Sequence, residues 1–82
     1  MKNSAIENYL KDLIFLLKEN ALKAVDEKNK LAYENVKDYN YSLGYLMAYH
    51  EVISLLRQQA VAFGISLESL GLHDIDPEND LL

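Results

Sequence analysis

The chain has 82 residues, which make one small domain and leave no room for a doubly wound sheet or a barrel with a ligand cavity. Half of the residues are apolar and only three are glycine and one proline, so the composition excludes both a disordered chain and an all-β protein. Without cysteine there is no disulfide framework, thiolate zinc site or thiol nucleophile. The formal charge of -5 has the wrong sign for binding phosphates, so we expect no nucleic-acid partner.

The first predicted element is a long amphipathic helix over residues 5–37. Neither glycine nor proline occurs between Ala5 and Leu43, and apolar residues recur along one face at helical spacing. On the other face, three acidic residues precede a lysine by four positions, an arrangement that stabilises helices. The pattern keeps its phase past Asn29, which favours a single helix; a break at residues 28–30 is the alternative.

The chain is expected to reverse direction at residues 37–42, because the Asp, Asn and Ser of this stretch favour caps and turns. A second helix is predicted over residues 41–63. Gly64 can take the left-handed conformation that ends a helix, with Ile65 folding back as its hydrophobic partner. The two long helices then form an antiparallel hairpin, and the predicted fold class is all-α.

Capping residues predict further short helical structure near the C-terminus. Ser66 is placed to cap a short helical turn over residues 67–70, which Gly71 ends. Asp76 and Pro77 are the residue types preferred at the cap and at the first position of a helix. The hairpin is therefore expected to carry a short helical turn at its C-terminal end.

In this interpretation residues 1–72 form the helical hairpin and residues 73–82 form an acidic C-terminal tail. The acidic residues of the tail alternate as in a calcium loop, but the glycine and the bidentate glutamate that such a loop needs are missing. A solvated tail is the favoured interpretation; in the alternative, Ile75, Leu81 and Leu82 dock while the acids face water or a basic protein partner. The candidate partner-binding residues of the tail are Asp74, Asp76, Glu78, Asp80, Leu81 and Leu82.

The second predicted helix carries more apolar surface than one neighbouring helix can cover. Its apolar residues span about half of the circumference, wider than the ~100° stripe that covers a single core. Below about 70–80 residues a single core rarely supplies more than ~3–5 kcal/mol, and disulfides and thiolate metal sites are excluded here. We therefore expect two copies to form a homodimer that closes a four-helix bundle, with the second helix at its centre.

His50 and Arg57 lie on the apolar side of the second predicted helix. Most such residues belong to a core or an interface, and neither a carboxylate nor a histidine follows His50 at i+3 or i+4, so a helical metal motif is absent. The alternative is a small-molecule or metal site between the subunits near His50 and Arg57. The candidate ligand or interface residues are Tyr45, Tyr49, His50, Ile53, Leu56 and Arg57; no metal or cofactor is predicted.

The remaining motifs point away from membranes and from enzymes. Charged residues flank the early apolar run Leu13–Leu17 and interrupt the later ones, so we expect neither a signal peptide nor a membrane span, and a cytoplasmic location. Neither a nucleophile elbow, a P-loop nor a glycine-rich dinucleotide turn occurs. The sequence therefore predicts a small non-enzymatic protein-interaction or regulatory protein that acts as a helical homodimer.

Overall fold

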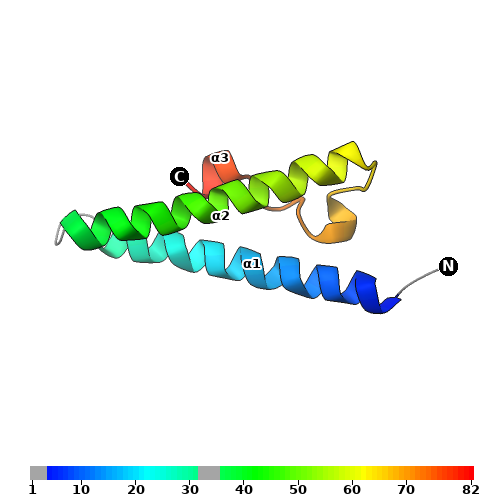
Figure 1. Cartoon of the computed structure of the whole chain (residues 1–82), viewed down its shortest axis with the longest axis horizontal. Coiled ribbons are helices and arrows are strands. Elements are labelled where there is room, and N and C mark those ends of the chain that lie inside the picture. Colours follow the sequence, from blue (N-terminus) through cyan, green and yellow to red (C-terminus); the bar gives the residue numbers. More distant parts are fainter. Residues whose placement is uncertain (1–3, 32–35) are drawn as a thin grey trace.

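The structure is a computed structural model that describes residues 4–31 and 36–82, and of Val36 only the backbone. Within these residues it contains no strand and four helical elements: α1 (Ser4–Lys30), α2 (Val36–Ala62), the 3-10 helix η1 (Glu68–Leu70) and α3 (Pro77–Asp80). Figure 1 shows α1 and α2 lying antiparallel along a molecule of 53 × 22 × 16 Å. The predicted all-α hairpin with a short C-terminal helical turn is confirmed.

The first long helix is shorter than its apolar pattern predicts. α1 ends at Lys30, so the single helix over residues 5–37 is wrong, and the alternative break at residues 28–30 lies close to the observed end. Lys28 and Lys30 occupy the last turn, where basic side chains interact favourably with the negative end of the helix dipole. The apolar spacing continues beyond Lys30. The prediction was too long because such periodicity shows which face of a helix is apolar and does not show where the helix ends.

The second long helix begins earlier than predicted. α2 starts at Val36, so the bend over residues 37–42 and a second helix starting at residue 41 are also wrong. Asp38 lies in the first turn of α2, where the positive end of the helix dipole favours an acidic side chain. The residue types that start a helix are the same ones that form bends, which explains the misplaced reversal. Residues 32–35, between the two helices, lie outside the described part of the chain.

The C-terminal end of α2 follows the prediction. Gly64 is left-handed, with a φ of 68°, and its N–H donates to the carbonyl of Val61 at 3.0 Å. The N–H of Ile65 donates to the carbonyl of Ala60 at 2.8 Å. Together these two hydrogen bonds form a Schellman motif, which satisfies carbonyl groups that the last turn of a helix otherwise leaves free.

The two short elements are held by the capping residues that predicted them. The Oγ of Ser66 accepts a hydrogen bond from the N–H of Ser69 at 3.2 Å, and Gly71 ends η1 with a φ of 71°. Asp76 caps α3 through its side chain, and Pro77 occupies the first helical position. Local capping chemistry therefore locates both elements correctly.

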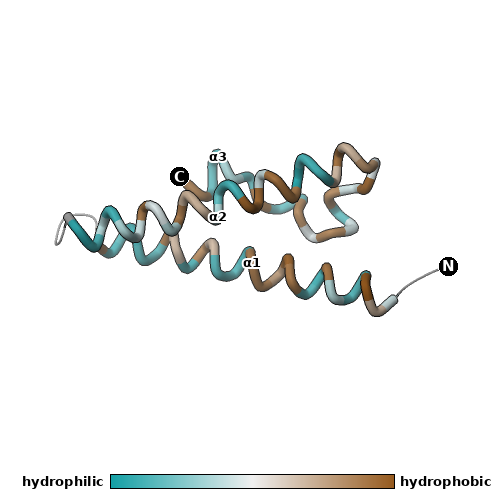
Figure 2. Tube along the Cα trace, in the orientation of Figure 1, coloured by the Kyte–Doolittle hydropathy of each residue, from teal (hydrophilic) through white to brown (hydrophobic). Residues whose placement is uncertain are grey.

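The core lies between α1, α2 and the chain that follows η1. Figure 2 shows hydrophobic residues recurring along both long helices. Alanines on α1 allow α2 to approach closely, because a small side chain keeps the helix axes near each other. The buried cluster consists of Ile14, Ala21, Ala24, Leu46, Ile53, Leu72, Ile75 and Leu81. Three of these eight residues come from the C-terminal end of the chain, which therefore supplies a third side of the core.

Candidate functional site

The C-terminal segment, residues 71–82, runs back along α2, and α3 packs against that helix (Figure 1). Ile75 is 2% exposed and Leu81 is fully buried, so the interpretation of a solvated tail is wrong, and the docking alternative holds for these two residues. Leu82, which was expected to dock as well, is 54% exposed. The acidic residues of the segment, Asp74, Asp76, Glu78 and Asp80, are exposed. A partner-binding role for the tail stays a prediction.

Arg57 holds the C-terminal segment onto α2. Its Nη1 donates to the carbonyl oxygen of Leu72 at 3.1 Å and also to that of Ile75. Both of these residues are buried, so the guanidinium supplies hydrogen bonds that water supplies elsewhere on the surface. The arginine that the sequence marks as a candidate ligand residue is thus engaged by its own chain.

Lys18 of α1 holds the same segment from the opposite side. Its Nζ donates to the carbonyl oxygen of Gly71 at 2.7 Å and to Oδ1 of Asp74 at 2.5 Å. The hydrogen bond from Lys18 is the main cause that lowers the pKa of the Asp74 carboxyl below its ordinary value of 3.8. Lys18 was not among the residues predicted from the sequence; the signal that could have indicated it is its place four residues after Ile14, on the apolar face of α1.

His50 faces α3. Its Nε2 is buried and makes no hydrogen bond within residues 4–31 and 36–82, although it lies 3.3 Å from Oε1 of the exposed Glu78. The two side chains form an ion pair when the imidazole is protonated. In the part of the chain that the structure describes, no three His, Asp or Glu side chains gather as metal ligands would.

The structure places the candidate residues of α2 in three different surroundings. Ile53 is fully buried in the core of its own chain, and Leu56 and Tyr49 are half-buried against that core. His50 and Arg57 face the C-terminal segment. Tyr45, in contrast, is exposed. The sequence did not separate these three surroundings, and a role of the six residues in an interface or a ligand site stays a prediction.

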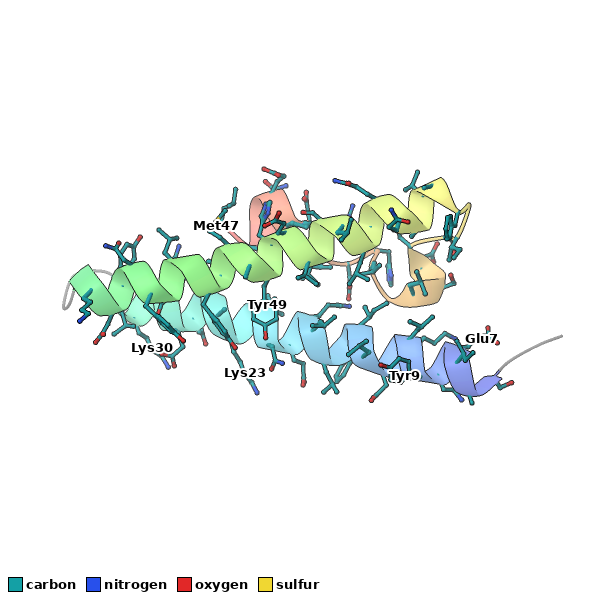
Figure 3. All side chains as sticks on the ribbon, viewed as in Figure 1. Glu7, Tyr9, Lys23, Lys30, Met47 and Tyr49 are labelled. Atoms are coloured by element: carbon teal, nitrogen blue, oxygen red, sulfur yellow. The ribbon has the colours of Figure 1, made fainter. Side chains whose placement is uncertain are left out.

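A row of tyrosines lies along the first half of α2. The rings of Tyr41 and Tyr45 stack with centroids 6.4 Å apart, and the rings of Tyr45 and Tyr49 meet edge to face at 5.2 Å. The hydroxyl groups of Tyr45 and Tyr49 are 3.5 Å apart, and this hydrogen bond is the main cause that raises the pKa of Tyr45 above 10.0. Figure 3 shows Tyr49 and Met47 on opposite sides of α2.

Two hollows accompany these features. A groove of about 190 Å³ on α2 is lined by Tyr45, Ala48, Tyr49 and Val52. A second pocket, of about 370 Å³, lies between α1 and η1, where its lining includes Phe15 and the stems of two lysines. The first is formed by one helix face alone, and the second borders the contact between Lys18 and the C-terminal segment.

Replacing Arg57 with Met is expected to lower the free energy of unfolding by about 2–3 kcal/mol, because two carbonyls lose a charged donor while the apolar stem is kept. Urea unfolding followed by circular dichroism measures the change. Gln58→Met is the matched control, since Gln58 is the exposed neighbour on the same helix. Equal stability of Arg57→Met and the wild type would show that these two hydrogen bonds contribute nothing.

The contact between Lys18 and Asp74 predicts a small dependence of stability on pH. Because folding lowers the pKa of Asp74, its contribution is complete above the ordinary value of 3.8 and is lost as the pH falls through the lower folded value. Asp74 is 57% exposed, so the contribution is below about 1 kcal/mol. Asp74→Asn should therefore lower stability at pH 7 and have a progressively smaller effect as the pH falls below 3.8. The exposed Asp12→Asn is the control, and an equal pH profile for the two variants would contradict the prediction.

Comparisons with other proteins leave the function to be argued from this geometry. Within the described residues no helix combines the length and apolarity needed to cross a bilayer. Arg57 and Lys18, two charged side chains that could bind a ligand, instead donate hydrogen bonds to backbone carbonyl groups of their own chain. No protein-family model matches the chain, and no significant similarity is found to a curated protein or to a solved structure.

Proposed function

We propose that the protein is a non-enzymatic interaction protein that acts as a homodimer, in which two hairpins form a four-helix bundle with α2 at its centre. The observation that carries this proposal is the distribution of large apolar side chains. Among the described residues nine apolar side chains besides Pro77 are buried, whereas sixteen large ones are exposed. Isolated exposed apolar residues are normal on a protein surface, but an excess of this size indicates a surface that another chain covers.

The shape of the molecule supports the same proposal. Its accessible surface is 5948 Å², whereas a compact monomer of this mass exposes about 5000 Å². Its radius of gyration is 14.7 Å, against about 11.7 Å for a compact domain of this length. The excess surface is comparable to the roughly 800 Å² that each partner buries in a stable interface. A second copy can cover that area without further change in the fold.

The polar side chains of the site support a role in interaction rather than catalysis. Arg57 and Lys18 both hydrogen-bond to carbonyl groups of the C-terminal segment. A group engaged in this way positions the chain and is not free to act on a substrate. The proposed non-enzymatic role rests on this use of the cations.

Sedimentation velocity over a wide range of concentrations tests the proposal. We expect a species of twice the 9.4 kDa chain mass, which dissociates to a monomer on dilution. Circular dichroism recorded at the same concentrations shows whether the helices persist after dissociation. A folded monomer at every concentration would contradict the homodimer.

A further inference from the structure

We propose that a second copy of the chain docks along one exposed stripe of α2, antiparallel to the first, with the twofold axis close to Val52. This stripe, called the α2 seam, consists of Tyr41, Tyr45, Ala48, Val52, Leu55, Gln59 and Ala62. The inference rests on the proposed homodimer and specifies which surface forms it and in which direction the two helices run.

The spacing of the α2 seam is that of a coiled coil. From Tyr41 to Ala62 its members follow one another at alternating intervals of four and three residues, and every member except Gln59 is apolar. Such a repeat keeps side chains on one face of a helix that packs against another helix. All seven residues are exposed, with Tyr41 at 75%, Leu55 at 56% and Val52 at 42%. The repeat therefore has no partner within the part of the hairpin that the structure describes.

The hairpin core uses a different face of α2. Leu46 and Ile53 point into the core of the chain, and His50 and Arg57 face the C-terminal segment. The α2 seam lies away from both, so a second chain can reach it while α1 and the C-terminal segment stay in place. Between Tyr41 and Ala62 the only full charges are Glu51 and Arg57, and Arg57 is occupied, so little charge has to be desolvated along the seam.

A hollow on the seam has the form of a coiled-coil hole. The groove of about 190 Å³ is lined by Tyr45, Ala48, Tyr49 and Val52, which are related as i, i+3, i+4 and i+7. In a coiled coil, each inserted side chain occupies a hole formed by four residues of the facing helix. Ala48 is the smallest of the four lining residues, so the groove has room at this point for a larger side chain of a facing helix. The contacts between the tyrosine rings order its walls before the partner arrives.

The sizes of the seam residues favour an antiparallel arrangement. The first end of the seam carries tyrosines, and the last end carries Gln59 and Ala62. A parallel pair would place tyrosine on tyrosine and leave Ala48 facing Ala48. An antiparallel pair centred near Val52 places Leu55 of the second copy over the hole at Ala48, and the reciprocal contact forms by symmetry. The same pairing brings the Gln59 amide near tyrosine hydroxyl groups, with which it can hydrogen-bond.

Two valines on the same helix test which face forms the interface. Val52 lies on the α2 seam, whereas Val61 lies off it, and both are exposed, so neither change disturbs the core. We expect Val52→Glu to weaken dimerisation at least about 100-fold, because two buried carboxylates meet at the axis, and Val61→Glu to leave it unchanged. Sedimentation velocity measures both variants, with circular dichroism as the check on folding. If the wild type is a dimer and the Val52→Glu variant dimerises equally well, the α2 seam is not the interface, although the proposed homodimer stands. If the wild type is a monomer, both proposals are overturned.

The relative direction of the two α2 helices in the dimer is tested by exchanging the sizes of two residues of the α2 seam. In the antiparallel dimer, Ala48→Leu fills the hole and Leu55→Ala removes the side chain that enters it, so each is expected to weaken dimerisation about 10-fold or more. The double variant restores complementarity and should recover most of the affinity. In a parallel dimer, Ala48→Leu would add a leucine pair and strengthen dimerisation, which would overturn the antiparallel arrangement.

A distance measurement gives an independent test of direction. The chain has no cysteine, so Asn40→Cys provides a single attachment site for a spin label, at an exposed position off the α2 seam. Given a rise of 1.5 Å per residue, the antiparallel dimer predicts about 35 Å between the two labels, and a parallel dimer predicts about 10–20 Å. The longer distance supports the proposal, and the shorter one overturns it.

Discussion

Removing residues 73–82 is expected to abolish cooperative unfolding of the chain. The deletion takes Ile75, Pro77 and Leu81 out of the interior, and three buried side chains contribute about 5–9 kcal/mol. A domain of this length has a total stability of about 4–12 kcal/mol, so the loss is comparable to the whole. Urea and thermal unfolding of the shortened chain, followed by circular dichroism, measure the effect.

The matched control for this deletion keeps the length and changes the charge. Asp74, Glu78 and Asp80 are exposed, so replacing them together by their amides leaves the apolar contacts in place. This variant should unfold close to the wild type, apart from the small contributions of the Asp74 contact and of the hydrogen bond that Oδ2 of Asp80 accepts from the N–H of Asp76. A shortened chain with the unfolding midpoint of the wild type would show that the C-terminal segment contributes no stability.

Replacing Leu81 with Ala is expected to lower the free energy of unfolding by about 2–5 kcal/mol. Leu81 is fully buried in the cluster that includes Leu46 and Ile53, so the substitution removes apolar contacts and leaves a cavity. Urea unfolding at constant protein concentration measures the loss, since dimerisation couples stability to concentration.

Leu82 supplies the control for this substitution. It is the same residue type, one position further, and is 54% exposed. Leu82→Ala is expected to change stability by less than about 0.5 kcal/mol. If the two variants lose similar amounts of unfolding free energy, the burial of Leu81 does not hold the C-terminal segment, and the segment does not form a third side of the core.

These two predictions change how a partner of the acidic tail should be sought. Deleting the tail removes a binding surface and part of the core together, so a lost partner would carry no information about the acids. The amide variant of the exposed acidic residues removes their charge and leaves the buried apolar contacts in place. A basic partner captured by the wild type and not by this variant would support the predicted role of the tail.

The caps of the fold were predictable because each depends on neighbours in sequence. Gly64, Gly71 and the Asp76–Pro77 pair each act through hydrogen bonds or dihedral angles within a few residues. The position of the reversal was not predictable in the same way. Asp38 suits a bend and the first turn of a helix equally well, and packing of the two helices decides between them.

The candidate site was predicted only in part. Residue types indicate which side chains are buried better than they indicate which groups those side chains contact. The sequence placed His50 and Arg57 on an apolar face, and the structure places both next to the core. It could not show that the C-terminal segment covers them, because this depends on contacts between residues far apart in the chain. Lys18 was missed for the same reason: its partners, Gly71 and Asp74, lie at the other end of the sequence.

The sequence showed that α2 has a wide apolar arc, but it did not show which part of the arc is buried in the hairpin and which part is exposed. Ile53 and Tyr45 belong to the same arc in the sequence, yet one lies in the core and the other on the surface. Only the position of α1 and of the C-terminal segment shows which part of the arc is already covered. The remaining exposed part is the basis of the proposed dimer.

The docking of the C-terminal segment also bears on the order of folding. The contact between Lys18 and Asp74 joins residues 56 positions apart, whereas α1 and α2 form from local hydrogen bonds. Contacts between distant residues form late, because a long loop must close before they contribute. During synthesis the helices can form early, but the core is incomplete until Leu81 has left the ribosome. We therefore expect a nascent chain that ends before residue 72 to remain sensitive to protease, and resistance to arise only once Leu81 has emerged.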